Sequence, residues 1–395
     1  MLASWRWYGP LDHISVEEIA QAGASGVVTA LHEIPYGEVW PVETIKARKA
    51  LIEANPALDL QWRVVESLPV HERIKRGDGN LDTLFANYRQ SMANLAASGI
   101  NTICYNFMPL LDWTRTDLAK PLERGGHALH FSATRMAAFE LYMLGRKEAE
   151  ADYSPTTIEA AKTWFEASSS DDQDQLLGSI MSGLPGAYDR YDCDTLLQAL
   201  ALYREIDHAA LRQNYKRFLE EVIPTAEELG VRLCVHPDDP PRDILGLPRI
   251  VSNIDDIGWI MDAVSSPSNG LTLCSGSLGA NPENNVPEIA EKFADKIYFA
   301  HLRNVKKYAD GSFTEWSHLE GDTDMVALVR ILVEEELRRG VVDDANISIP
   351  FRPDHGHALL DDLGRKSHPG YPLIGRMRGL AEIKGVITAV SSYAS

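Results

Sequence analysis

The sequence contains 395 residues, which is enough for one large α/β barrel or for two ordinary domains, each with a sizeable core. Its formal net charge is -19, from 57 acidic and 38 basic residues, so its field repels nucleic acid and anionic membrane surfaces, and we expect neither as a partner. The four cysteines form no CxxC pair and the sequence contains neither a signal-peptide pattern nor a long apolar span, which together predict a soluble cytoplasmic protein.

Short apolar runs rich in β-forming residues alternate with helical patterns along the chain. This alternation is typical of βα units around a parallel sheet. Eight runs are predicted to be strands: residues 5–9, 26–31, 60–67, 101–107, 231–237, 271–276, 296–303 and 347–352. A ninth run, residues 385–390, is assigned to a terminal helix, because residues 371–390 can be read as one helical stretch. The predicted fold class is therefore α/β, a TIM (β/α)8 barrel in which residues 1–395 form a single domain.

Several helices have recognisable ends. Ser15 and Glu18 form a capping-box pattern for a helix that ends at Gly23. Residues 80–99 carry apolar side chains at helical spacing and end in glycine. Residues 324–340 end in two arginines and a glycine, which suits the negative end of a helix.

The alternation is interrupted between the fourth and fifth predicted strands. Residues at approximately 113–212 contain helical patterns, one of them starting at Ser154, and polar stretches such as SSSDDQDQ. These features predict a helical insertion after strand four of the barrel. Two interpretations stay open: the insertion is a surface elaboration or oligomer contact, or it is a lid over the mouth of the barrel.

Four residues able to bind a metal lie at the ends of the last four strands, one in each βα unit. They are His236, Cys274, His301 and Asp354, each at the C-terminal end of a predicted strand. Barrel active sites are assembled at this end, so we expect the four side chains to share one metal ion. Thiolate, imidazole and carboxylate ligands leave zinc, iron and manganese possible. A closed tetrahedral zinc would be structural, whereas a catalytic ion needs open positions.

Two arginines lie on the same faces as these ligands. Residues two apart on a strand share a face, so Arg303 should point the same way as His301, and Arg352 the same way as Asp354. We expect both arginines to contact a substrate carboxylate or oxyanion. Each residue also has a structural alternative, since a single histidine can be a hydrogen-bonded structural residue and Cys274 alone could fill the core.

The chain resembles the mannonate dehydratase family over essentially its whole length. The stretches that carry the resemblance are WRWYGP, GVVTALHEIP, CYNFMPLLDWTRTDL, HPDDPPRDILGLPRI, CSGS, HLRN and RPDHGH. The resemblance implies a xylose-isomerase-like TIM barrel that dehydrates D-mannonate to 2-keto-3-deoxy-D-gluconate with Mn(II) or Fe(II), in the breakdown of hexuronates such as glucuronate. It implies metal ligands at His236, Cys274, His301 and Asp354, and acid/base residues at His355 and Tyr371.

The chemistry of such an elimination can also be argued without the resemblance. Removing water from a sugar acid requires a base, an acid and a positive site for the developing charge. His355 follows a predicted metal ligand and is a credible proton carrier, whereas Tyr371 needs a nearby cation to act as a base. Which of the two is base and which is acid stays open. The expected partner is a small sugar acid, and a homo-oligomer is possible.

Two alternative functions stay open on the sequence alone. One is a metal-dependent sugar isomerase or epimerase on the same kind of barrel. The other is a non-catalytic sugar-acid binding protein with structural zinc. The sequence sets neither the native metal nor the epimer that is accepted.

Overall fold

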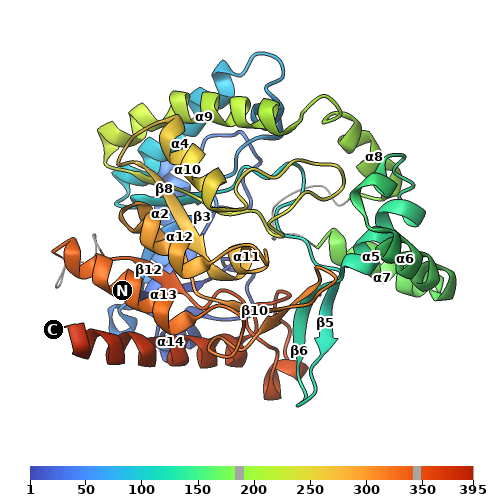
Figure 1. Cartoon of the computed structure of the whole chain (residues 1–395). Helices are drawn as coiled ribbons and strands as arrows, with labels where there is room; N and C mark the ends of the chain where they lie inside the picture. The colour runs from blue at the N-terminus through green and yellow to red at the C-terminus, as the bar shows by residue number, and fades with distance from the viewer. Residues whose placement is uncertain (183–190, 341–347, 395) are drawn as a thin grey trace.

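Eight parallel strands close into a barrel with helices packed around it (Figure 1). The computed structural model describes residues 1–182, 191–340 and 348–394. Around the barrel the strand order is β1-β12-β9-β8-β7-β4-β3-β2. The strands are β1 (Leu2–Arg6), β2 (Gly26–Thr29), β3 (Gln61–Glu66), β4 (Thr102–Tyr105), β7 (Arg232–Val235), β8 (Asn269–Cys274), β9 (Ile297–His301) and β12 (Pro350–Arg352). The predicted TIM barrel is confirmed.

Each of the eight predicted strand runs overlaps one barrel strand. The first strand begins at Leu2 and ends at Arg6, so its predicted range of residues 5–9 was placed too late. Residue 347, the start of the last predicted run, lies outside the described residues. The ninth apolar run is part of α14 (Leu373–Ala394), as expected.

Helices surround the barrel and bury their apolar faces against it. They are α1 (Val16–Gln21), α2 (Val42–Glu53), α3 (Glu72–Arg76), α4 (Asp82–Ala97), α9 (His208–Leu229), α10 (Ile254–Ala263), α11 (Ser275–Gly279), α12 (Val286–Lys292), α13 (Met325–Arg338) and α14, with short helices η1 (Pro56–Leu58), η4 (Ala294–Lys296) and η5 (Leu360–Gly364). The predicted capping box of Ser15 and Glu18 is present at the start of α1. No helix in the described part of the chain is long and apolar enough to cross a membrane.

The inside of the barrel is filled by side chains. Val28, Val64, Cys104 and Phe299 form a buried cluster there. Side chains two residues further along a strand point the same way, one step closer to the C-terminal rim. This alternation places Glu66 above Val64 and His301 above Phe299. The buried apolar cluster therefore lies directly beneath the polar side chains at the rim.

The segment between β4 and β7 contains both helices and strands. Its helices are α5 (Ala133–Ala138), η2 (Phe139–Met143), η3 (Ala149–Asp152), α6 (Pro155–Ala167), α7 (Ser170–Ile180) and α8 (Cys193–Ala201), and they lie to one side of the barrel (Figure 1). Its strands, β5 (Asp117–Pro121) and β6 (His127–Phe131), were not predicted. They join β10 (Asn304–Lys307) and β11 (Phe313–Trp316) in a second sheet of order β10-β11-β6-β5.

The second sheet connects two distant parts of the chain. Strand β11 pairs antiparallel with β6, with Phe313 opposite Phe131 and Thr314 opposite His130. The two phenylalanine rings stack at a centroid distance of 5.4 Å, within an apolar cluster that also includes helices of the inserted segment. The sheet therefore fastens the inserted segment to the chain that follows β9.

Candidate active site

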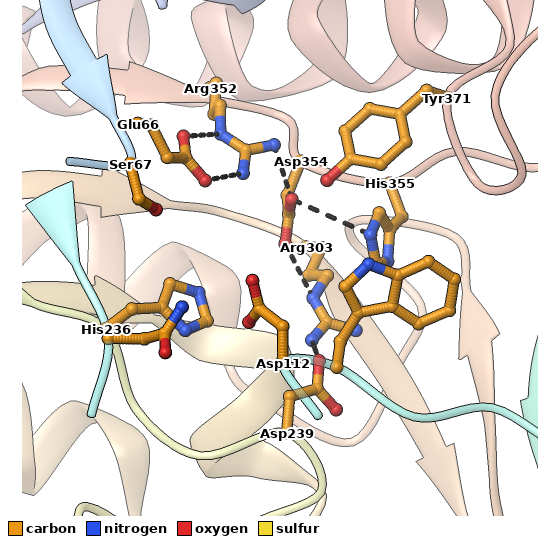
Figure 2. Close-up of a pocket in the computed structure, with 12 residues that line it drawn as sticks. Glu66, Ser67, Asp112, His236, Asp239, Arg303, Arg352, Asp354, His355 and Tyr371 are labelled. Atoms are coloured by element: carbon orange, nitrogen blue, oxygen red, sulfur yellow. Dashed lines mark hydrogen bonds and ion pairs between the residues drawn. The ribbon is translucent and has the colours of Figure 1, made fainter. Parts of the chain in front are cut away.

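A polar pocket lies at the C-terminal end of the barrel (Figure 2). Its lining consists mostly of ionisable and hydrogen-bonding side chains, namely Glu66, Ser67, Asn106, Asp112, Trp113, His236, Asp239, Arg303, Arg352, Asp354, His355 and Tyr371. The barrel strands end here, and the loops that follow them supply most of these residues. This is the end at which barrel enzymes build their active sites.

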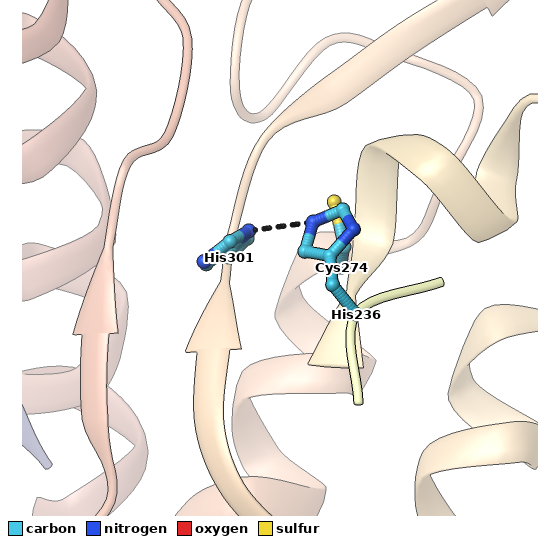
Figure 3. A group of neighbouring side chains, drawn as sticks. All are labelled: His236, Cys274 and His301. Carbon is cyan, nitrogen blue, oxygen red and sulfur yellow. Dashed lines mark hydrogen bonds between the residues drawn. The ribbon is translucent and has the colours of Figure 1, made fainter. Parts of the chain in front are cut away.

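Three of the predicted metal ligands meet at this rim (Figure 3). His236 follows β7, while Cys274 and His301 are the last residues of β8 and β9. One ligand atom from each lies within 4.8 Å of the other two. Asp354, the fourth predicted ligand, places Oδ2 at 3.8 Å from both Cys274 Sγ and His301 Nδ1. The structure thus brings the four predicted ligands together.

The two histidines present a ring nitrogen to this group. His236 Nδ1 lies 2.7 Å from the carbonyl oxygen of Pro237, to which it can only donate, so Nε2 is the nitrogen left to bind a metal. That Nε2 lies 3.1 Å from His301 Nδ1, while His301 Nε2 lies 3.5 Å from Glu66 Oε2. Partners of this kind on the far ring nitrogen are typical of metal-bound histidines, whose orientation they fix.

The thiol of Cys274 is poised to be a thiolate. Burial alone would raise its pKa, but the charge of Arg303 and hydrogen bonds with His236 and His301 hold the pKa well below its usual range. The hydroxyl and backbone N–H of Ser277 also donate to the sulfur, at 3.1 and 3.4 Å. Burial would lower the pKa of His236, but its hydrogen bond with Cys274 raises it to about 9.

Asp354 is held by both predicted substrate-binding arginines. Arg303 Nε lies 2.7 Å from its Oδ2, and Arg352 Nη1 pairs with its Oδ1 (Figure 2). Although burial opposes ionisation, these arginines and the neighbouring histidines keep the pKa of Asp354 well below its usual range. The backbone φ of Asp354 is +61°, a left-handed conformation that aspartate adopts more readily than most residues.

Arg303 and Arg352 line the pocket, and each is also paired with a second acidic group. Arg352 forms two hydrogen bonds with Glu66, at 2.6 and 3.0 Å. Arg303 pairs with Asp239 and with Glu315. Both guanidinium groups are therefore fixed by protein carboxylates, and they supply positive charge to the site from these positions.

The two predicted acid/base residues lie side by side. The rings of His355 and Tyr371 meet edge to face, with centroids 4.9 Å apart. Burial raises the pKa of Tyr371 to about 12, although Arg352 acts in the opposite direction. Nδ1 of His355 lies 3.1 Å from Oε1 of Glu315, and Nε2 lies 4.0 Å from Oδ1 of Asp354.

Sequence reasoning assigned no role to four acidic residues of the site. Glu66 ends β3 and follows the inward alternation of that strand, so strand parity could have found it. Asp239 lies three residues after His236 and pairs with Arg115 and Arg303. Asp112 follows β4, and its carboxylate points into the pocket (Figure 2). Glu315 lies on β11, which was not recognised as a strand.

The donor set fits a divalent metal ion. One thiolate, two imidazole nitrogens and one carboxylate converge, and the far nitrogen of each histidine faces an oxygen atom. Such a mixed set is compatible with zinc, iron or manganese. His236 and Asp354 of this donor set also line the pocket, so the pocket adjoins the same group.

The closed barrel and the ligand-rich pocket at its C-terminal rim define a TIM-barrel enzyme with a site suited to a divalent metal. The sequence profile of D-mannonate dehydratase (UxuA) matches residues 1–395. The chain belongs to this family, and it is accordingly a hydro-lyase.

Relatives with a curated name support the same assignment. The chain is 53% identical over 392 residues to mannonate dehydratase of Chromohalobacter salexigens, covering 99% of each chain. It is 52% identical over 390 residues to mannonate dehydratase of a Marinomonas species, covering 98% of this chain and 99% of the relative. The crystal structure of mannonate dehydratase from Streptococcus suis serotype 2 is similar along the whole chain, with a TM-score of 0.77, 33% identity and coverage of 94% of that chain.

Proposed function

We propose that the protein eliminates water from D-mannonate to give 2-keto-3-deoxy-D-gluconate, in the breakdown of hexuronates such as glucuronate. The observation that carries this proposal is the group His236, Cys274, His301 and Asp354 at the barrel rim, directly beside His355 and Tyr371. Family membership supports mannonate as the substrate and dehydration as the reaction.

The metal in this proposal is Mn2+ or Fe2+, held by His236, Cys274, His301 and Asp354. When bound, such an ion supplies Lewis-acid stabilisation of negative charge that develops on substrate oxygen. The carboxylate suits manganese, while the thiolate and the imidazoles suit iron. Both ions fit the donor set.

The protein groups move two protons. The proton on C2 of the sugar acid passes to a base, and the hydroxyl on C3 receives a proton and departs as water, which leaves an enol that becomes the 2-keto acid. His355 and Tyr371 are proposed for these two transfers. Glu315 can only accept a hydrogen bond from His355 Nδ1, so Nε2 is the nitrogen that exchanges the proton with substrate.

Arg303 and Arg352 are proposed to supply positive charge near the substrate carboxylate and the developing oxyanion. Both are buried and both contact Asp354, so their charge lies at the metal-binding group itself. In a site with little water such fixed charges act strongly. They offset part of the repulsion between an anionic substrate and a chain of formal charge -19.

A cytoplasmic location is part of the proposal. The four cysteines are all free, which suits a reducing compartment. A homo-oligomer is also proposed, with its size left to measurement.

The test is to incubate the purified protein with D-mannonate and Mn(II) and to follow formation of a 2-keto acid. Elimination gives the 3-deoxy-2-keto acid, and an isomerase or epimerase would give an isomer of the same mass as the substrate. A binding protein with structural zinc would give no product. The last two outcomes would each contradict the proposed function.

A further inference from the structure

Four carboxylates line the pocket, and they differ in what surrounds them. Glu66 is paired with Arg352, Asp239 with Arg115 and Arg303, and Asp354 with both Arg303 and Arg352. Asp112 has neither a hydrogen-bond nor an ion-pair partner within residues 1–182, 191–340 and 348–394. Its carboxylate points into the pocket, between His236 and Arg303 (Figure 2). It is therefore available to a ligand.

The loop that carries Asp112 is held firmly over the barrel. Trp113 forms a parallel bridge with Asp239, and the next backbone N–H, of Thr114, donates to the carbonyl of Asp239 at 3.0 Å. Arg115, which is fully buried, pairs with the carboxylate of Asp239 at 2.7 Å. These contacts fix the position of Asp112, so its carboxylate can contribute to recognition without a large ordering cost.

A second unpaired polar group lies next to this carboxylate in the chain. The indole Nε1–H of Trp113 is buried and has no acceptor within the described residues, and Trp113 lines the same pocket. The ring of Trp113 also packs edge to face against His355, with centroids 5.9 Å apart. Consecutive residues that line the pocket thus carry a free acceptor and a buried donor without a partner, and hydroxyl groups can bond to both kinds of group.

Charge decides which end of the substrate this loop meets. A carboxylate accepts hydrogen bonds and repels another carboxylate, so Asp112 cannot hold the carboxylate end of a sugar acid. The polyol end of the substrate is uncharged, and its hydroxyl groups can donate hydrogen bonds to Asp112. Burial raises the pKa of Asp112, although His236 and Lys75 oppose the shift. A hydrogen bond donated by a substrate hydroxyl would offset the free-energy cost of keeping this carboxylate ionised away from water.

We propose that Asp112 accepts hydrogen bonds from the polyol chain of the sugar acid and that, together with Trp113 Nε1, it determines which sugar acid is accepted. This inference rests on the proposed function, because it assigns a substrate-recognition role in the same pocket. Asp112 is a specificity-determining residue in this view, and proton transfer is left to His355 and Tyr371.

The first experiment compares Asp112→Asn and Asp112→Ala with the parent protein, each loaded with Mn(II). Losing a hydrogen bond to a charged group should raise the KM for D-mannonate about 10- to 100-fold, with kcat changed much less. Metal content should be unchanged. A matched control is Asp117→Asn, because Asp117 lies on β5 and pairs with Arg135 outside the pocket. It should leave KM unchanged.

The second experiment removes hydroxyl groups from the substrate. The 4-, 5- and 6-deoxy analogues of D-mannonate are each assayed with the parent and with Asp112→Asn, which forms a double-mutant cycle between protein and ligand. At least one analogue should have equal kcat/KM with both proteins, since it lacks the hydroxyl that Asp112 binds. Equal penalties for D-mannonate and for all three analogues would overturn the inference.

Other outcomes separate this inference from the proposed function. An Asp112→Asn protein with the parent KM, or one that loses its metal or loses kcat at unchanged KM, would overturn the specificity role while dehydration by the parent still stands. A parent protein that neither binds D-mannonate by calorimetry nor dehydrates it would overturn both. Trp113→Phe keeps the aromatic ring and should raise KM by a smaller factor, about 3- to 10-fold.

Discussion

Oε1 of Glu315 lies 3.1 Å from Nδ1 of His355, which ties a residue of the second sheet to the proposed proton carrier. The same carboxylate is buried and pairs with Arg115 and Arg303, which hold its pKa at about 2 against the effect of burial. Glu315 is therefore ionised and can only accept from His355. This fixes the ring orientation and leaves Nε2 facing the pocket.

Glu315→Gln is expected to lower kcat about 10- to 100-fold, because the amide can no longer stabilise one orientation and one tautomer of His355. Steady-state kinetics with D-mannonate measures the change. KM and metal content should change little, and Glu315→Asp should recover part of kcat. Wild-type kcat in the glutamine variant would show that this contact does not support the reaction.

His355→Asn and Tyr371→Phe are each expected to abolish turnover while metal content persists. Each substitution removes a proton-transfer group, and neither residue is among the proposed metal ligands. The measurement is product formation together with metal analysis of the same sample. A variant that keeps full activity would remove its residue from the mechanism.

Removal of the metal is expected to abolish activity, and adding Mn(II) or Fe(II) should restore it. A chelator treatment followed by dialysis provides the metal-free protein, and Cys274→Ala should bind the ion more weakly because it lacks the thiolate. Activity that survives complete metal removal would argue against the proposed chemistry. Metal analysis of freshly isolated protein would identify the native ion.

Metal affinity is expected to fall as the pH is lowered below about 9. The pKa of His236 is raised from its usual value to about 9, so in the metal-free protein this histidine is protonated at neutral pH. A metal ligand must be neutral imidazole, so binding at pH 7 has to release that proton. Calorimetry in buffers of different ionisation enthalpy counts the protons released. No proton release at pH 7 would contradict the assignment of His236 as a ligand.

Asp362→Ala is expected to destabilise the protein by about 1 to 2 kcal/mol. The carboxylate of Asp362, on η5, accepts hydrogen bonds from the backbone N–H groups of Leu373, Ile374 and Gly375, which start α14. Without it these donors lose their partner and the helix loses a favourable charge at its positive end. Urea unfolding measures the effect. The exposed neighbour variant Asp361→Ala is the control and should change the free energy of unfolding by less than about 0.5 kcal/mol.

The barrel could be predicted from sequence because its strands are short apolar runs at regular intervals. The ligands could be predicted because each lies at the C-terminal end of one such run, and parity placed Arg303 and Arg352 on the same faces as His301 and Asp354. In the structure all four contact one another through Asp354.

The second sheet could not be predicted in this way. Strands β5 and β6 are short, and DLAKP and HALHF carry no continuous apolar run. Strand β6 is stabilised by pairing with β11, which lies far away in the chain, and β5 pairs in turn with β6; local sequence does not encode the pairing with β11. For the same reason Glu315 was missed, since nothing beside it in sequence indicates that it meets His355. Asp112 lay inside a stretch that carries the family resemblance, but its lack of a partner is visible only in three dimensions.

The position of β11 limits how far this enzyme can be miniaturised. One edge of β11 is bonded to β10 and the other to β6 of the inserted segment, so deleting the insertion would strip hydrogen bonds from the strand that carries Glu315. The bare edge would lie next to the reaction centre and could pair with other chains. A smaller catalyst on this scaffold would need a substitute for the β5–β6 hairpin before the helices beyond it could be discarded.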